Sequence, residues 1–478
     1  MRLSLFRCAL IQEEGFRVKN DNISIWHRTF ILTFTLIPII MCIVFNVLLF
    51  YGLFISVVFS LCMFKVCGFT FKELLIMIIN SFIECRELFI LIVLIGITIP
   101  IWFSSGIIPA MMFYGFDYII GKNLIFVAFI FTSLVSIFIG SAVACISTIG
   151  IALLGLGKVF QVPDYILLGA IVSGAFLADK LSPISGLVNL MISTIRISYK
   201  KALIYMLRTT LPACIIVSIV YFYMGRNYTI EEYALGNFQK SIGENYFMSP
   251  LLLLVPVLIF LLCFLGVKMV NSLFTGLTIG IIISIFCQKV SLVKIFSYIL
   301  FGYKGNTTSL ELNKILVGGG IQSIISIFFI IMMAVALSSI FSGTGIINPI
   351  INKMISKVRC REEIIVKTGI ISAILTIICD QSMAIILPGE LLRDKYKKLK
   401  IENYILARTI SDTGVVMAPL IPWNGNSLFI LALTGISSIK YGPYALLCYV
   451  LPIITLCLSF FTKNIPRREL ANCKKLRV

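Results

Sequence analysis

The chain has 478 residues, of which 59% are hydrophobic and only 13% are charged, and its formal net charge is +19. Soluble domains carry about 25% charged residues, so this composition excludes an ordinary soluble protein and predicts an all-α, polytopic helical membrane protein. A transmembrane helix needs ~20 apolar residues, and the apolar runs between Thr29 and Phe461 supply enough for roughly 11–13 spans.

The excess positive charge gathers just outside the hydrophobic runs, around residues 196–208, 393–408 and 463–477. Such clusters are typical of cytoplasmic loops, so they orient the protein in the cell membrane and do not indicate a nucleic acid partner. We therefore expect a cytoplasmic segment at 1–28, a transmembrane domain at 29–462 and a basic cytoplasmic tail at 463–478. The polar stretch 225–248 divides the domain into halves at 29–224 and 249–462 and is expected to be external.

In the first half, spans are expected at about 29–46, 48–66 and 88–103. The charged segment 70–87 is either an interfacial amphipathic helix or the charged end of a span. After a span at 123–140, residues 164–178 lead into the stretch 173–190, SGAFLADKLSPISGLVNL. This stretch holds an acid and a base side by side, Asp179 and Lys180, followed by Ser182, Ser185 and Asn189. Hydrocarbon cannot satisfy such groups, and charges at membrane depth are usually functional.

In the second half, spans are expected near 250–265, 267–286, 293–301 and 318–341. Asp380 then lies deep in the apolar segment 368–390. The stretch 410–429 holds Asp412 and Thr413, two prolines and Asn424, and a final span covers about 444–461. Paired apolar segments interrupted by Gly and Pro in two halves favour a transporter site built from broken or re-entrant helices near the bilayer midplane.

The side chains in these broken segments suit a small cation. Carboxylate, hydroxyl, amide and freed backbone carbonyl oxygens are the ligands that hard cations prefer. A carboxylate in a low-dielectric environment can hold either a proton or a metal cation near neutral pH, which is the chemistry of ion/proton exchange. In the structural alternative, a membrane-buried aspartate only holds helices together by pairing with Lys180 or Arg408.

Five motifs, in order along the chain, resemble those of the NhaC family of Na⁺/H⁺ antiporters within the ion-transporter superfamily. They are SSGIIPAMMFYG, GSAVACISTIGIALLG, LADKLSPISGLVN, CDQSMAIILPGE and SDTGVVMAPLIPWN. The resemblance covers residues 30 to 460 and implies exchange of Na⁺ or Li⁺ against H⁺, with no cofactor and no enzymatic activity. By motif position it implies that the ion-binding residues are Asp179, Ser182, Ser185, Asn189, Asp380, Asp412, Thr413 and Asn424, with Asp179 and Asp412 as the Na⁺ ligands.

The chain departs from the family motifs in its first half. Gly186, Leu187 and Val188 stand where the family has Asp-Thr-Thr, and Val143 and Cys145 stand where it tends to Trp and Thr. Apolar groups thus replace polar ligands, and if the substrate of this protein differs from that of the family, we expect the difference to arise first at Gly186, Leu187 and Val188.

Other functions remain open at this point. The same scaffold could exchange an organic anion of the malate or lactate type, or an amino acid, with Arg408 as carboxylate partner. An intramembrane aspartyl protease is disfavoured because Asp179 and Asp380 lack a Gly-x-Gly-Asp-like signature. A non-transporting structural protein would not require Asp179, Asp380 and Asp412 together. The expected partners are the lipid bilayer, a small cation and the proton, and a homo-oligomer is left open.

Overall fold

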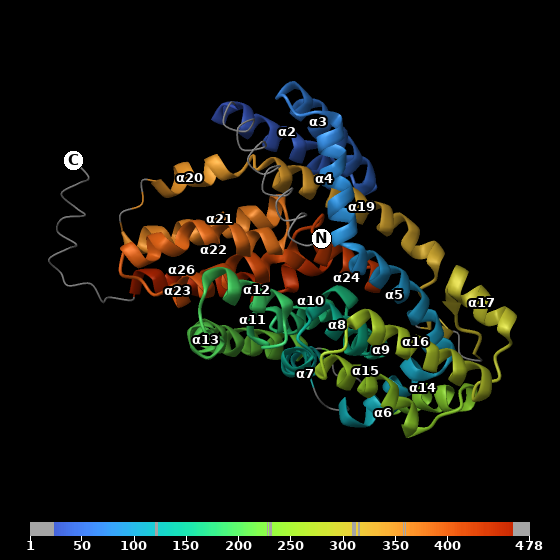
Figure 1. Ribbon diagram of the computed structural model, residues 1–478. Coiled ribbons are helices and arrows are strands. Elements are labelled where there is room, and N and C mark those ends of the chain that lie inside the picture. Colours follow the sequence, from blue (N-terminus) through green and yellow to red (C-terminus); the bar gives the residue numbers. More distant parts are fainter. Residues whose placement is uncertain are drawn as a thin grey trace.

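The computed structural model describes residues 23–461, apart from 120–122, 227, 229–231, 308–311, 314–315, 357 and 359. The described residues are almost entirely helical, which confirms the predicted all-α class (Figure 1). The predicted tail 463–478 and most of the segment 1–28 lie outside the described residues. Among the described residues, a single antiparallel strand pair, β1 (Tyr303–Lys304) and β2 (Val317–Gly318), lies between two helices of the second half.

The helices fall into two series, before and after α14 (Glu232–Asn245). The first series is α2 (Ile25–Val44), α3 (Leu49–Val66), α4 (Phe71–Glu84), α5 (Arg86–Ser104), α6 (Ile107–Ile119), α7 (Leu124–Ile139), α8 (Ala142–Cys145), α9 (Ile151–Val159), α10 (Asp164–Ala175), α11 (Ala178–Leu181), α12 (Gly186–Ile195) and α13 (Tyr199–Gly225). The second is α15 (Leu254–Phe264), α16 (Met269–Phe286), α17 (Leu292–Phe301), α19 (Ile321–Thr344), α20 (Asn348–Ser356), α21 (Arg361–Ile378), α22 (Gln381–Lys398), α23 (Asn403–Ile410), α24 (Gly425–Thr434), α25 (Ser438–Tyr441) and α26 (Leu447–Phe461).

The second series repeats the first with a constant offset of 239 residues from α5 onward. Helix α10 begins at Asp164 and α23 at Asn403, while α12 begins at Gly186 and α24 at Gly425. Residues with positive φ recur at the same offset: Gly106 and Gly345, Gln161 and Lys400, Arg196 and Gly435. The segment Tyr-Ile-Leu at 165–167 also recurs at 404–406. Because helix ends, positive-φ residues and sequence all keep one offset, the two halves are structural repeats.

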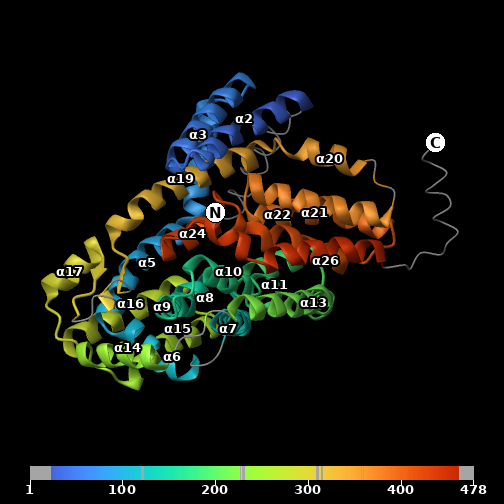
Figure 2. The same ribbon diagram turned by 180° about the vertical axis from the view of Figure 1, so that it is seen from behind.

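The halves interlock by packing crosswise. Helices α3 and α4 of the first half pack against α19, and α16 and α17 of the second half pack against α5 (Figures 1 and 2). The amide N–H of Gly320, just before α19, donates to the carbonyl oxygen of Gly96 in α5 at 2.7 Å. For segment 70–87 the sequence left two structures open, and the structure shows the helix α4. A capping box between Thr70 and Glu73 caps the N-terminus of this helix. The long helices α5 and α19 therefore each pack against two helices of the other half.

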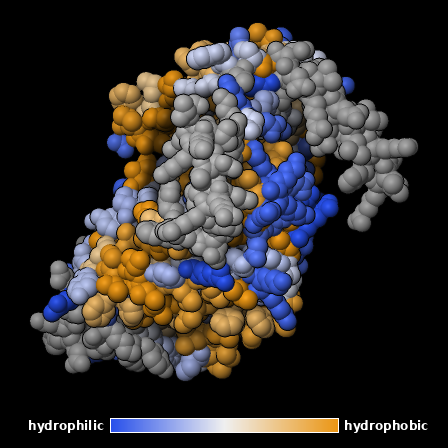
Figure 3. Space-filling view, turned by 90° about the vertical axis from the view of Figure 1, so that its left-hand side faces the viewer, coloured by the Kyte–Doolittle hydropathy of each residue, from blue (hydrophilic) through white to orange (hydrophobic). Residues whose placement is uncertain are grey.

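Seven helices are long and apolar enough to cross a membrane, or up to ten if each bent pair is one span, among the residues that the structure describes. Three further apolar runs form helices of 10 to 17 residues: Leu124–Ile139, Ala142–Lys158 and Leu292–Phe301. The expected 11–13 spans counted every apolar run as a crossing, whereas the structure divides several runs into shorter pieces at Gly, Pro and polar residues. Large hydrophobic residues cover much of the surface, as lipid contact requires (Figure 3).

Helices break at corresponding places in the two halves. In the first, α10 ends at Ala175, α11 is a single turn, and a tight turn at residues 183–184 leads to α12. In the second, α23 continues as a π-helical turn, Ser411–Val415, and a short 3₁₀ turn is followed by a tight turn at residues 422–423 before α24. Such irregular backbone at membrane depth frees carbonyl oxygens and is tolerated where protein or a water-filled cavity covers it.

Candidate functional site

An ion pair between Lys180 and Asp412 joins the broken segments of the two halves. Lys180 lies in the single turn α11, Asp412 lies in the π-helical turn 411–415, and both side chains are completely buried. The ammonium of Lys180 also donates to Thr209 Oγ1 at 3.3 Å. The second carboxylate oxygen of Asp412 accepts a hydrogen bond from the hydroxyl of Thr455 in α26. Two charges are thus held together out of solvent, with polar groups on both sides.

The π-helical turn that carries Asp412 is held by hydroxyl groups. Thr413 donates to the carbonyl oxygen of Thr409 at 2.7 Å, and Thr376 in α21 donates to that of Gly414 at 3.1 Å. A Cβ atom on Gly414 would overlap Ser372 Oγ, so α21 can approach only because residue 414 is glycine. The hydroxyl of Thr413 therefore stabilises the π-helical turn in which it lies.

Asp179 lies in the same turn as Lys180 but in a different environment. It is 9% exposed, and Ser185 Oγ donates to its Oδ1 at 3.5 Å. The backbone N–H of Ala142, the first residue of α8, also donates to this carboxylate. A helix N-terminus stabilises negative charge, so this carboxylate is held without a basic partner.

Two other predicted ligands of the first half make only local contacts. The hydroxyl of Ser182 is buried and accepts from the N–H of Ile184 at 3.3 Å. Asn189 is exposed and donates to the carbonyl oxygen of Pro183 at 3.1 Å. The structure does not bring Asn189 to Asp179 or Asp412.

Asp380 and Asn424 line a cavity of about 510 Å³. Both are helix caps: Asp380 accepts from the N–H of Met383 at the start of α22, and Asn424 accepts from the N–H of Asn426 at the start of α24. Gln381 connects the cavity wall to the turn of Asp412, because its amide donates to the carbonyl oxygen of Val415 at 2.6 Å. Its oxygen accepts from Asn426 at 2.8 Å. Glu84 adds a second carboxylate to the lining.

The positions where the chain departs from the family motifs fall on or beside this cavity. Val143 and Leu187 line it, together with polar residues of the second half such as Asp380 and Asn424. Val188 is completely buried in the core, and a Cβ atom on Gly186 would meet nothing within 4 Å. The cavity lining therefore combines apolar side chains at two of these positions with oxygen atoms from both halves of the chain.

The repeat places the two motifs at corresponding positions in their halves, but it does not align their aspartates. At the offset of 239 residues, Asp412 corresponds to Ser173, and Asp179 corresponds to Ala418. The prolines of the two motifs, Pro183 and Pro422, do correspond. The two aspartates therefore occupy different positions in their halves. The similar residue types of the two motifs do not reveal this difference.

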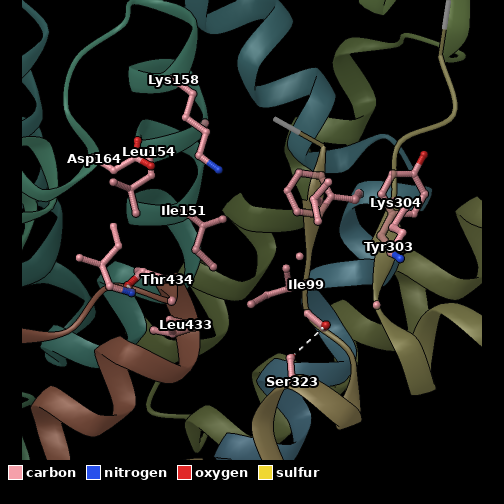
Figure 4. Close-up of a pocket in the computed structure, with 18 of the residues that line it drawn as sticks. Ile99, Ile151, Leu154, Lys158, Asp164, Tyr303, Lys304, Ser323, Leu433 and Thr434 are labelled. Carbon is pink, nitrogen blue, oxygen red and sulfur yellow. Dashed lines mark hydrogen bonds between the residues drawn. The ribbon is translucent and has the colours of Figure 1, made fainter. Parts of the chain in front are cut away.

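A second cavity, of about 410 Å³, lies at the other ends of the same helices (Figure 4). The first cavity is lined by Leu88 and Phe429, and the second by Ile99 and Leu433, which lie farther along α5 and α24. In Figure 4, Lys158 and Asp164 project from one side and Tyr303 and Lys304 from the other. None of the predicted site residues lines this second cavity.

Sequence reasoning named Lys180 only as a structural partner, and it did not include among the ion-binding residues four polar groups that hold the site: Thr209, Gln381, Asn426 and Thr455. Gln381 adjoins Asp380 in the CDQ motif, which was a usable signal. Thr455 lies in an apolar run of the last span and carries no signal in the sequence. Its role depends on α26 packing against the turn of Asp412.

Comparisons with known proteins show the family of this chain. A family model described as "Na+/H+ antiporter family" matches residues 174–463. The chain is 28% identical over 416 residues to the Na⁺/H⁺ antiporter NhaC of Bacillus subtilis, covering 86% of this chain and 92% of that one. It is 28% identical to NhaC of Alkalihalophilus pseudofirmus, covering 82% and 85%. It is 24% identical to the malate-2H⁺/Na⁺-lactate antiporter of B. subtilis, covering 80% and 83%. The resemblance to NhaC proteins is thereby confirmed, and this chain belongs to the Na⁺/H⁺ antiporter family.

Proposed function

We propose that this multi-pass membrane protein exchanges Na⁺ or Li⁺ for H⁺ across the cell membrane. The observation that carries the proposal is the buried ion pair of Lys180 and Asp412 at the junction of two broken segments. Family membership and the similarity to NhaC antiporters support the same function.

The ion pair provides a means of coupling. Leaving one charge buried without a partner costs about 3–5 kcal/mol, so Asp412 needs a positive partner at every stage. The ammonium of Lys180, a bound proton and a Na⁺ ion can each fill that place. When Na⁺ binds Asp412, Lys180 loses its counter-charge and releases its proton. When the proton returns, the ammonium displaces Na⁺.

Oxygen atoms of neighbouring residues would complete the coordination shell of a Na⁺ ion bound to Asp412. Na⁺ is a hard cation that takes several oxygen ligands, and the Thr455 hydroxyl already contacts Asp412. Asp380 and Asn424 line the cavity through which the ion would approach. Asp179 and Ser185 form a second oxygen pair beside Lys180, and we assign them to holding the cation or proton during exchange.

Two cavities at opposite ends of α5 and α24 fit a carrier that is open to alternate sides. A transporter must reach its site from each side of the membrane in turn, and inverted or parallel repeats allow this by rocking one bundle against another. Helix α11 packs against the turn 411–415, so a small shift of one relative to the other would make or break the ion pair.

Exchange of an organic anion is the second candidate. The apolar side chains Val143 and Leu187 and the cavity volume of about 510 Å³ suit a larger solute, and a malate/lactate antiporter is among the relatives. Against it, the cavity lining contains two carboxylates, Glu84 and Asp380, and no basic residue. Arg408, the expected carboxylate partner, does not line it.

The deciding experiment is Na⁺-induced proton movement in everted vesicles or proteoliposomes. We expect Na⁺ and Li⁺ each to dissipate a preset pH gradient in vesicles that contain the protein. A gradient that responds to malate or lactate but to neither cation would overturn the proposal in favour of the second candidate.

A further inference from the structure

Arg408 is a buried arginine that the proposed exchange does not use. It lies in α23, one helical turn before Asp412, and is 6% exposed. Its Nε atom is buried and has no hydrogen-bond partner. A buried guanidinium without a hydrogen-bonded counter-charge is costly, so an unpaired donor at this depth indicates that a ligand is expected there.

Two further arginines near Arg408 add positive charge, which makes the binding of an anion there more favourable. Arg361, the first residue of α21, and Arg208 in α13 both act on Arg408 electrostatically, and Arg361 also has a buried Nε without a partner. Helix α23 packs against both α13 and α21, so three helices bring these arginines together. The hydroxyls of Tyr396 and Tyr205 also act on Arg408, and Arg408 in turn acts electrostatically on the ammonium of Lys180. The nearby carboxylate of Glu402 accepts a hydrogen bond from Tyr205.

The surroundings of Arg208 show which kind of anion fits. Its guanidinium lies over the ring of Tyr205 at 4.5 Å, and Tyr205 stacks on Tyr404. Ile204 and Leu211, four residues before and three after Arg208, share its helix face and are 54% and 57% exposed. Such residues on an apolar span face lipid. Arg208 therefore lies where the basic cluster meets the hydrocarbon surface.

We propose that Arg208, Arg361 and Arg408 bind the headgroup phosphate of an anionic phospholipid between α13, α21 and α23. Arginine forks suit phosphate oxygens, and basic pockets between transmembrane helices on the cytoplasmic side are the usual place for anionic headgroups. Figure 3 views this end of the molecule and shows hydrophilic residues beside hydrophobic surface. The acyl chains would lie along the apolar face of α13, and the phosphate would provide the missing counter-charge for Arg408.

The site is tested by lipid binding to the purified full-length chain in detergent. Delipidated protein is titrated with phosphatidylglycerol, phosphatidylcholine or inorganic phosphate, and bound phosphorus and the unfolding temperature are measured. We expect phosphatidylglycerol to bind and to raise the unfolding temperature, while the other two probes have little effect. Equal binding of phosphatidylcholine, or equal stabilisation by inorganic phosphate, would overturn the assignment to an anionic lipid.

Variants locate the site. Arg361→Gln and Arg208→Gln should each weaken phosphatidylglycerol binding about tenfold, as expected for the loss of one charge-assisted hydrogen bond. Arg408→Gln should also weaken binding about tenfold. Because Arg408 is buried, its replacement can impair folding as well, so the test of the site rests on the other two variants. The matched control is Lys398→Gln, an exposed basic residue at the same end of the bundle, which should bind as the parent does. Unchanged binding in Arg361→Gln and Arg208→Gln would refute the site. Binding is measured without an ion gradient, so its outcome is independent of the exchange activity.

Discussion

Ser173 and Asp412 occupy the same position in the two repeated halves, 239 residues apart. Each is hydrogen-bonded to the last long helix of its own half. Ser173 pairs with the hydroxyl of Tyr221 in α13 at 2.7 Å, and Asp412 accepts from Thr455 in α26. The repeat thus builds two equivalent places, of which one holds a neutral hydroxyl and the other an acid. Only the second half therefore provides a carboxylate at this position, and that carboxylate pairs with Lys180.

Replacing Asp412 by Asn should abolish Na⁺-driven proton movement. The change leaves the Lys180 ammonium buried without its counter-charge, which costs about 3–5 kcal/mol and should also lower the amount of protein in the membrane. Exchange in everted vesicles and membrane abundance are measured together. The double variant Asp412→Asn with Lys180→Gln removes both charges, so it should recover abundance without exchange. Asp394→Asn, whose side chain is 71% exposed, is the control. Normal exchange by the single variant would leave Asp412 with a structural role only.

Lys180→Gln should separate cation binding from proton movement. Without the ammonium, Asp412 has no internal competitor for Na⁺, so Na⁺ should still bind and exchange with Na⁺. Proton release should fall about tenfold or more, since the group that carries the proton is gone. Sodium-22 exchange and dissipation of a pH gradient are compared in the same proteoliposomes. Persistence of coupled proton movement would show that another group carries the proton.

Leu187→Thr should increase the apparent affinity for Na⁺. The side chain lines the cavity beside Asp380, and a hydroxyl there adds one oxygen that the family motif has and this chain lacks. One hydrogen bond or ligand oxygen contributes about 1 kcal/mol, which predicts a roughly fivefold lower half-saturating Na⁺ concentration. Val188→Thr is the matched control, because Val188 is fully buried and does not line the cavity. The same gain in both variants would argue against a direct ligand at residue 187.

Gly414→Ala should inactivate the protein, whereas Gly425→Ala should not. A Cβ atom at residue 414 overlaps Ser372 Oγ and would push α21 away from the turn of Asp412. A Cβ atom at residue 425 meets nothing within 4 Å. Both substitutions replace a glycine near the site by alanine and so reduce backbone freedom in the same way. A difference between their effects therefore measures the close packing at residue 414. Exchange activity and unfolding temperature are the readouts, and equal effects would refute the packing argument.

Cys85 should report the charge of the cavity. It lines the cavity just before α5, and burial, followed by the charges of Asp380 and Glu84, raises its pKa above the ordinary value of a cysteine thiol. A raised pKa keeps the thiol protonated at neutral pH, so alkylation by a maleimide should be slow there and accelerate as pH rises. Glu84→Gln removes one negative charge and should speed the reaction at a given pH. Glu87→Gln, which does not line the cavity, is the control for Glu84→Gln, and Cys85→Ser provides the background. No difference between the two glutamate variants would contradict the electrostatic coupling.

The sequence by itself determined the class of protein and most of the polar residues near the site. Hydropathy is a local property, so apolar runs identify membrane helices without knowledge of packing. Asp179, Asp380 and Asp412 stand out because a charged residue in an apolar run has a high cost that must be compensated. The motifs around them were sufficient to recognise the family, which the comparisons confirm.

Only the tertiary structure decided which of these groups meet. Lys180 adjoins Asp179 in the sequence but pairs with Asp412, 232 residues away, because α11 packs against the turn 411–415. Asn189 belongs to the same motif as Asp179 yet is exposed on α12, since the helix turns its side chain away. The repeat assigns Ser173, and not Asp179, as the counterpart of Asp412. Long-range pairing depends on how helices cross, and crossing depends on uncharged residues such as Gly414 and Thr455, whose contacts with distant helices cannot be read from the sequence.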